Sequence, residues 1–203
     1  MSVYRVPAGT ARIEHEVSRS RFIATLGNAE SVEAARAFIH ERRAEMPDAT
    51  HHVYAFKVGY GSSITEGVSD DGEPTGTAGP PVLAVLRGAD VGDAVLVVTR
   101  YFGGIKLGTG GLVRAYGDAA RAVIGVMVTQ EKIEQRRIGL TLPYPLYERV
   151  KRIAGQYEAS LDAEEFGAEV TLYLTLPLTA LELFTAAIRD LSAGRISPVD
   201  LDS

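Results

Sequence analysis

Residues 94–116 have the sequence AVLVVTRYFGGIKLGTGGLVRAY, which joins a strand pattern, a turn and a helix pattern in one segment. The continuous apolar run Ala94–Tyr101 is typical of a central strand that is buried on both faces of a sheet. Gly103 and Gly104 predict a turn, and Thr109–Met127 places its apolar residues at helical spacing. The segment therefore indicates a globular domain of mixed α and β structure.

The rest of residues 1–130 is predicted to add strands and helices to this segment. Ser31 is a good N-cap for a helix that Pro47 ends. Alternating or apolar stretches predict strands at residues 11–17, 22–26 and 50–60, and a short helix is expected at residues 80–86. Fourteen of the 21 glycines lie between Gly59 and Gly117. We expect a long, polar, glycine-rich loop at residues 61–79.

Residues 131–203 have a different composition, with only 4 of the 21 glycines, so we place a domain boundary between residues 130 and 131. Strand patterns at 138–142, 159–163, 170–176 and 196–201 alternate with helix patterns at 146–157 and 181–191. Thr179 and Glu182 have the spacing of a capping box at the start of the second helix. The order β-α-β-β-α-β is that of a ferredoxin-like domain.

The composition excludes several classes of protein. The 203 residues include no cysteine, which rules out disulfides, a cysteine nucleophile and thiolate metal sites. No apolar run approaches the roughly 18 residues of a membrane span, and the N-terminal MSVYRVP has no signal-peptide pattern. We therefore expect a cytoplasmic protein without a membrane partner. The net charge of -5 means that any contact with nucleic acid needs a local basic patch.

The glycine-rich segment after the predicted central strand has the features of an anion site. If Thr109 caps the helix, the N–H groups of Gly110 and Gly111 are free at its positive end, and Arg100 and Lys106 add charge. The alternative is that the glycines only form a strand-to-helix turn. A nucleic-acid or phosphate site here would use the following residues: Arg100, Tyr101, Lys106, Gly108, Thr109, Gly110, Gly111 and Arg114.

A second segment, SDDGEPTGTAG at residues 69–79, is acidic. Asp70, Asp71 and Glu73 could bind Mg²⁺ or act as an acid/base pair. We favour the alternative, in which they cap turns and pair with Arg100 or Lys106, because Asp-Gly and Glu-Pro are turn dipeptides.

The two adjacent histidines do not indicate a metal site. His51 and His52 begin a strand and so face opposite sides of the sheet, and we predict that His52 is hydrogen-bonded and partly buried. The other histidines have no spacing suited to zinc. We expect neither a metal ion nor a cofactor.

Three motifs together resemble the YigZ/IMPACT family: HHVYA at residues 51–55, SDDGEPTGTAG at 69–79, and VTRYFGGIKLGTGGLVRAY at 98–116. The resemblance implies a ribosomal-protein-S5-domain-2-like fold for residues 1–130. For residues 131–203 it implies a ferredoxin-like domain similar to the last domain of elongation factor G. It also implies a signature loop formed by the following residues: His51, His52, Asp70, Asp71, Glu73, Thr75 and Thr77.

The resemblance favours a translation-associated binding protein that contacts RNA or the ribosome through the basic face of residues 100–114. Eukaryotic members regulate translation under amino-acid starvation, and we do not expect their regulatory partner here because this sequence lacks their extra N-terminal domain. One alternative is an enzyme that handles a phosphorylated small molecule or nucleotide at Gly108–Gly111, with Asp70 or Asp71 near a metal. Another is a scaffold whose loops meet a protein partner.

Overall fold

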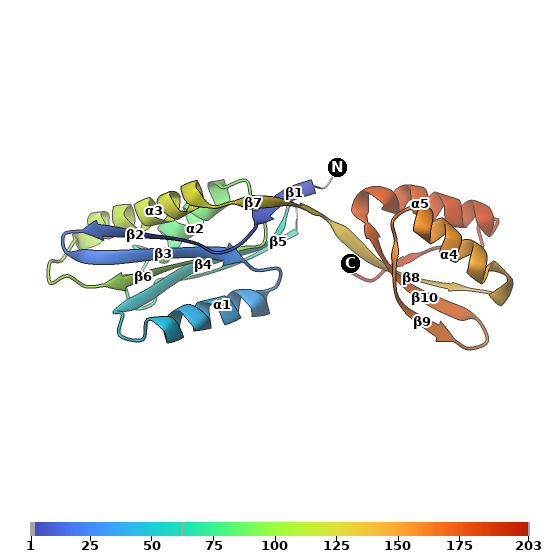
Figure 1. The fold of residues 1–203 in the computed structure, drawn as a ribbon, viewed down its shortest axis with the longest axis horizontal. Helices are drawn as coiled ribbons and strands as arrows, with labels where there is room; N and C mark the ends of the chain where they lie inside the picture. The colour runs from blue at the N-terminus through green and yellow to red at the C-terminus, as the bar shows by residue number, and fades with distance from the viewer. Residues whose placement is uncertain (1–2, 62, 203) are drawn as a thin grey trace. The chain divides into compact units, whose positions relative to one another are not determined.

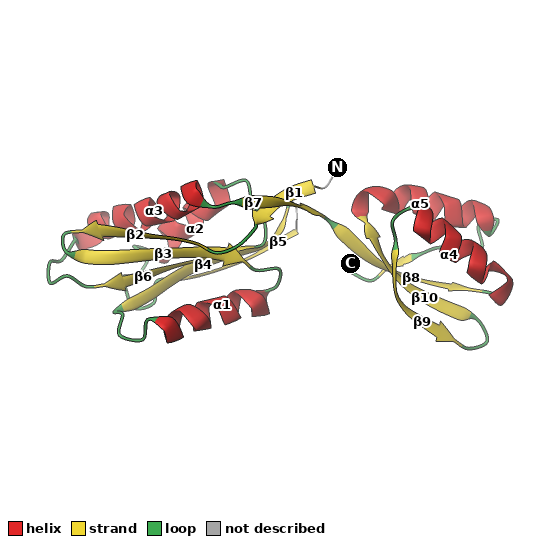
Figure 2. Cartoon of the chain, in the orientation of Figure 1, coloured by secondary structure: helices red, strands yellow, loops and turns green. Residues whose placement is uncertain are grey.

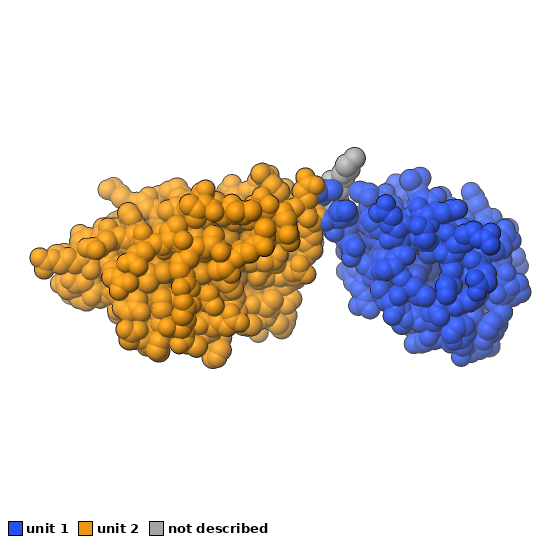
Figure 3. Space-filling model, in the orientation of Figure 1, with its two compact units in different colours: residues 1–3, 133–203 blue, residues 4–132 orange. Residues whose placement is uncertain are grey.

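The computed structural model describes residues 3–61 and 63–202 and contains both helices and strands (Figure 1, Figure 2). It has two compact units, which are named here in chain order (Figure 3). The first unit is residues 4–132, orange and labelled unit 2 in the key, and the second is residues 133–203 with residues 1–3, blue and labelled unit 1. Both units combine helices with a β-sheet, which confirms the predicted α+β class. The elements up to residue 133 are β1 (Val3–Pro7), β2 (Ala11–Val17), β3 (Ser20–Asn28), α1 (Val32–Glu45), β4 (His51–Tyr60), β5 (Ser63–Ser69), α2 (Gly79–Gly88), β6 (Ala94–Tyr101), α3 (Gly108–Val126) and β7 (Thr129–Ile133).

The first unit is built on a five-stranded sheet with the order β2-β3-β6-β4-β5, so β6 is its central strand. Each pair of neighbouring strands is antiparallel. Helices α2 and α3 cover one face of the sheet and α1 covers the other (Figure 1). Leu96 and Val98 of β6 pack in the core beneath α2 and α3, whereas Val95 and Val97 pack in the core beneath α1. The strand is therefore buried on both faces, as predicted.

The predicted loop at residues 61–79 is only partly a loop, because residues 63–69 form the edge strand β5. The strand pairs with β4 through its backbone, and both Ile64 and Val68 are exposed. Gly67 lies against the ring of Phe56, where a Cβ atom would be 2.2 Å from the ring carbons. Strand β5 is polar, lies at the edge of the sheet and needs glycine for close packing, so its sequence has no strong apolar alternation. For this reason the sequence pattern did not predict the strand.

The second unit confirms the predicted ferredoxin-like order. Its elements are β8 (Gln135–Leu142), a short 3-10 turn (Tyr144–Leu146), α4 (Tyr147–Gln156), β9 (Ser160–Phe166), β10 (Val170–Pro177), α5 (Leu178–Leu191) and β11 (Val199–Asp200). The sheet order is β11-β8-β10-β9 with antiparallel pairs, and its core includes Leu140, Leu172 and Phe184. The predicted capping box is wrong, because α5 begins directly after Pro177 and Thr179 lies within the helix.

The division between the units lies after Lys132, two residues beyond the boundary placed from the sequence. Strand β7 pairs with β1, and its Lys132 is bound to the first unit by a salt bridge from Nζ to Asp93 Oδ2 at 2.8 Å. Asp93, whose side chain is only 3 % exposed, also accepts hydrogen bonds from the Tyr4 hydroxyl and the Gly59 N–H, both at 2.7 Å. Burial would raise the pKa of Asp93, but these three donors outweigh it and lower that pKa.

We predict that Asp93→Asn lowers the free energy of unfolding by about 2 kcal/mol, because Lys132 loses its buried carboxylate and keeps only the exposed Glu30 as a partner. A lowered pKa stabilises the fold at pH values above the unfolded pKa of about 4, and this contribution is lost as the pH falls through the folded value. The difference between wild type and variant should therefore shrink in acid. Urea denaturation of both proteins at several pH values measures this difference in stability.

Asp90→Asn is the matched control, because Asp90 binds Arg5 and Tyr60 at the surface. Its loss of stability should be clearly smaller than that of Asp93→Asn. Equal losses for the two variants would contradict the role assigned to Asp93.

Candidate functional site

The chain between β6 and α3 forms an exposed glycine-rich loop that leads into the N-terminus of α3. The helix begins at Gly108 after the N-cap Leu107, so the prediction that Thr109 caps it is wrong. Gly108 has a φ of +70°, a left-handed conformation that glycine adopts without strain, so the chain turns at this residue as it enters the helix. The N-cap Leu107 has no polar side chain, and among the described residues no side chain accepts a hydrogen bond from the N–H groups of the first turn of α3.

In the acidic loop between β5 and α2, the Asp70 side chain is hydrogen-bonded to the backbone that follows it. The carboxylate accepts hydrogen bonds from the N–H groups of Gly76, Ala78 and Gly79 at 2.8, 3.0 and 2.8 Å. It therefore caps α2, whose N-cap residue Ala78 has no polar side chain. Burial would raise the pKa of Asp70, but the three N–H groups lower it.

The second carboxylate, Asp71, binds the start of β4. Its Oδ1 accepts a hydrogen bond from Arg43, and its Oδ2 accepts one from the His52 N–H at 2.6 Å. The His51 ring contacts the Asp71 carbonyl oxygen, with Nδ1 2.8 Å away. The His52 ring lies on the other face of the sheet, where it is buried and its Nδ1 is 3.1 Å from Thr99 Oγ1, as predicted. Burial lowers the pKa of His52, with a smaller contribution from Arg43.

The third carboxylate, Glu73, is buried and connects the acidic loop to β6 and α3. Its Oε1 accepts hydrogen bonds from Arg100 Nη1 and from the Tyr116 hydroxyl, both at 2.7 Å. The His51 Nε2 lies 3.8 Å from the same oxygen. Burial and, to a smaller extent, the bond to Glu73 raise the pKa of Tyr116.

Arg100 was predicted to add charge at the anion site, but the residue is only 5 % exposed and its charge is paired with Glu73, as the alternative for the acidic loop predicted. The guanidinium lies between the rings of Phe22 and Phe102, at 5.3 and 5.5 Å from their centroids. The next residue, Tyr101, points to the opposite face of the sheet and donates to Asp48 at 3.0 Å. The structure therefore does not bring the Tyr101 ring to the site.

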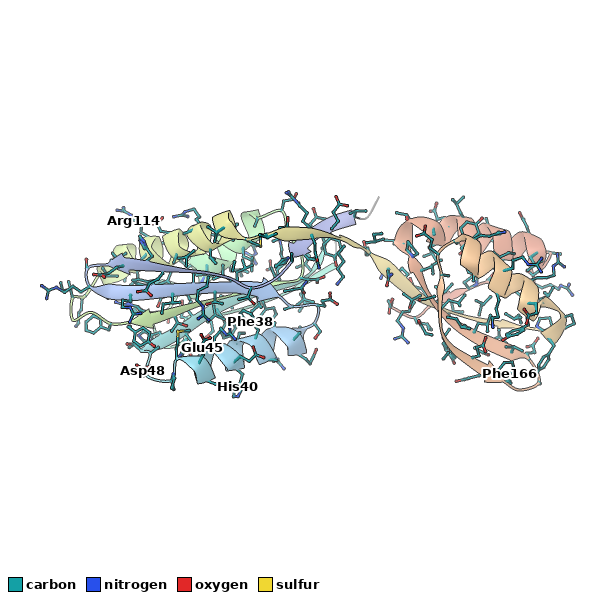
Figure 4. All side chains as sticks on the ribbon, in the orientation of Figure 1. Phe38, His40, Glu45, Asp48, Arg114 and Phe166 are labelled. Atoms are coloured by element: carbon teal, nitrogen blue, oxygen red, sulfur yellow. The ribbon has the colours of Figure 1, made fainter. Side chains whose placement is uncertain are left out.

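Other predicted site residues remain at the surface of the loop and the helix. Lys106 and Arg114 are exposed, and within the described residues neither has an ion pair. Figure 4 shows Arg114 on the side of α3 that points away from the sheet. In the signature loop, Thr75 is exposed and the Thr77 hydroxyl donates to the Pro74 carbonyl oxygen at 2.6 Å.

Two further residues of this end of the first unit, Arg19 and Phe102, were not among the site residues predicted from the sequence. Gly103 packs against the β2–β3 turn, where a Cβ atom would be 2.1 Å from the carbonyl oxygen of Arg19. This brings the exposed Arg19 to the glycine-rich loop, although the two residues are far apart in sequence. The Phe102 ring is 47 % exposed. The exposed cations of this surface are thus Lys106, Arg114 and Arg19.

A pocket of about 330 Å³ lies where the acidic loop, the glycine-rich loop and the start of α3 meet. It is lined by Glu73, Pro74, Arg100, Phe102, Lys106, Leu107, Gly108, Thr109 and Leu112. The structure therefore brings the two motifs that the sequence singled out to one pocket.

The acidic loop does not form a metal centre in the part of the chain that the structure describes, where no three His, Asp or Glu side chains are placed to bind one ion. Each of its carboxylates is already engaged by N–H, arginine or tyrosine donors. In the described residues, no helix is both long and apolar enough to span a membrane.

Comparisons with known proteins cover nearly the whole chain. Residues 18–124 match the family model of the Impact N-terminal domain, and residues 140–195 match a domain of unknown function, DUF1949. The chain is 39% identical to the IMPACT family member YigZ of Escherichia coli, over 97% of each protein. It is 38% identical to an IMPACT family member of Haemophilus influenzae, over 97% of this chain and 96% of that one. A crystal structure of a hypothetical protein, 39% identical, has a TM-score of 0.81 and covers 98% of this chain and 97% of that one.

We predict that Glu73→Ala lowers the free energy of unfolding by about 3 kcal/mol or more, because it leaves the Arg100 guanidinium buried without a counter-charge. The double variant Glu73→Ala/Arg100→Met should be more stable than the single variant, since it removes the buried charge and keeps an apolar stem between the phenylalanine rings. Chemical denaturation of the three proteins measures both differences.

Both variants remove the acceptor of the Tyr116 hydroxyl, so their comparison isolates the charge of Arg100. A double variant that is less stable than Glu73→Ala would contradict the assignment of Arg100 as a buried, paired charge.

Proposed function

The chain belongs to the IMPACT family, and we propose that it is a translation-associated protein that binds RNA, free or in the ribosome, through the loop between β6 and α3. The main support is the set of exposed cations without ion pairs, Lys106, Arg114 and Arg19, on an otherwise acidic protein. We infer the role in translation from the one that the family resemblance implies for the eukaryotic members.

The chemistry of this surface suits an RNA strand better than a protein partner. Exposed lysine and arginine side chains bind phosphates, and their charge is available because no carboxylate in the described residues neutralises them. An exposed aromatic ring such as that of Phe102 can stack on an unpaired base. The positive N-terminus of α3 lies in the same surface.

The alternative of a metal-dependent phosphoryl-transfer enzyme has less support. Such an enzyme needs carboxylates that are free to bind Mg²⁺ near the phosphates. Here Asp70 binds three backbone N–H groups, Asp71 binds Arg43, and Glu73 binds Arg100. These partners favour a structural role for the acidic loop over a catalytic one.

Gly110 gives independent support for a partner at the start of α3. It has no positive φ, and a Cβ atom placed there would meet nothing within 4 Å. Alanine in a helix is more stable than glycine by about 1 kcal/mol. The fold therefore does not need glycine at this position, whereas a ligand that approaches the backbone closely does.

We predict that Lys106→Ala and Arg114→Ala each weaken binding to single-stranded RNA. Each lost phosphate contact should also reduce the slope of log K against log salt by about 0.7. Fluorescence anisotropy with a labelled oligonucleotide, at several salt concentrations, measures affinity and slope together. Co-sedimentation with ribosomes provides the second readout.

Arg36→Ala is the matched control, since Arg36 is an exposed cation of α1, on the opposite face of the same sheet, and has no ion pair in the described chain. It should leave affinity and salt slope unchanged. If wild type binds neither RNA nor ribosomes at low salt, or if all three variants behave alike, the proposal is wrong.

We predict opposite effects of Gly110→Ala on stability and on binding. The helix should gain about 0.5–1 kcal/mol, while the added Cβ weakens RNA binding by blocking close approach to the backbone. Denaturation and anisotropy measure the two effects. Gly125→Ala, in the last turn of the same helix and equally open, should leave binding unchanged. Full RNA affinity in Gly110→Ala would contradict the close approach.

A further inference from the structure

The pocket between the acidic loop and the start of α3 has one positive end and one apolar wall. The positive end is formed by Lys106 and by the first turn of α3 at Gly108 and Thr109. Because no side chain caps the helix, its N–H groups and its dipole are available to an anion. This end of the pocket suits a phosphate group.

Arg100 provides an observation that does not depend on the helix. Its side chain is only 6 % exposed and lines the pocket, yet its Nε has no hydrogen-bond partner in the described residues. The other two guanidinium nitrogens bind Glu73 Oε1 at 2.7 Å and Ser20 Oγ at 3.3 Å. The guanidinium charge is therefore neutralised inside the pocket wall, so Arg100 fixes the shape of the pocket and leaves the charge of Lys106 to a ligand.

The local charge favours an anion although Glu73 is part of the wall. Glu73 is balanced by Arg100, which lies 2.7 Å away, and it also accepts the Tyr116 hydroxyl. The charge of Lys106 is then left in excess, together with the positive end of the helix. An anionic ligand therefore meets a net positive pocket.

The apolar wall consists of Pro74, Phe102, Leu107 and Leu112. Phe102 is the exposed aromatic ring of this surface, and its face can stack on a flat heteroaromatic group. The volume of about 330 Å³ is at the lower end of the range of ligand pockets. A pocket of this volume holds one small ligand but not a length of RNA strand.

We infer that this pocket binds a single nucleotide, with the phosphate at the N-terminus of α3 beside Lys106 and the base against Phe102. The inference rests on the proposed RNA binding and deepens it. In an RNA complex the bound nucleotide is one unstacked residue of a single strand, and the surface cations bind the backbone on either side of it. A free nucleoside monophosphate has the same chemistry, and the experiment distinguishes the two sources.

NMR titration of the ¹⁵N-labelled full chain tests the inference. We expect a nucleoside monophosphate and a short single-stranded RNA to shift the amide signals of Gly108, Thr109 and Gly110, and we expect inorganic phosphate to shift them at higher concentration. The unphosphorylated nucleoside should leave them nearly unchanged. If neither the monophosphate nor the RNA shifts these amides, the pocket inference is overturned.

Thr109→Glu separates loss of binding from loss of folding. A carboxylate in the first turn stabilises a helix but repels a phosphate, so the variant should stay folded and raise the Kd of the monophosphate by about tenfold or more. Ala122→Glu adds the same charge to an exposed position further along α3 and should change the Kd by less than about twofold. Equal effects of the two variants would overturn the inference.

The two proposals fail in different ways. If RNA binds wild type and Thr109→Glu equally and the amides do not shift, the pocket inference and the close approach at Gly110 are wrong, while RNA binding through Lys106 and Arg114 stands. If the monophosphate shifts the amides but neither RNA nor ribosomes bind, the ligand is a free nucleotide and the proposed function is wrong. If the monophosphate displaces the RNA oligonucleotide, both proposals are supported.

Discussion

The ion pair between Glu73 and Arg100 is the interaction on which the candidate site depends. It joins the acidic loop to the central strand β6, and through the Tyr116 hydroxyl it also joins that loop to α3. Both side chains are nearly buried, so the loss of either one leaves a buried charge without its partner. The pocket exists because this pair fixes three segments that are far apart in the sequence.

The same ion pair divides the basic residues of the site into two groups. Arg100 is a structural charge that lies in the pocket wall, near two phenylalanine rings and paired with a carboxylate. Lys106 and Arg114 are free of ion pairs in the described residues and remain available at the surface. The acidic loop, which resembles a metal site in sequence, is here the support that closes one side of the pocket.

Much of the fold could be predicted from periodicity alone. The buried strand β6, the helix α3 and the βαββαβ order of the second unit follow from strong apolar patterns. Strand β5 escaped prediction because it is polar and exposed at the sheet edge. The predicted caps at Thr109 and Thr179 were wrong because α3 begins at Gly108 and α5 begins directly after Pro177, so both threonines lie within their helices.

The site was harder to predict, because its contacts join distant residues. The sequence identified both loops, and it included the pairing of the acidic residues with Arg100 as one alternative. It could not show that only Glu73 makes this pair, that Arg100 is buried as a result, or that the Arg19 turn packs against Gly103. Burial and long-range packing are properties of the folded chain and leave little trace in local patterns.

The most direct test of the account is to crosslink RNA to the protein in cells by ultraviolet light and to map the crosslinked peptides after trypsin digestion. Cleavage after Arg100, Lys106 and Arg114 produces the peptides Tyr101–Lys106 and Leu107–Arg114, which contain the glycine-rich loop and the start of α3. We predict that the crosslinked nucleotides are attached to these two peptides. Crosslinks confined to α1 or to the second unit, or the absence of crosslinked RNA, would contradict the proposed RNA binding through this loop.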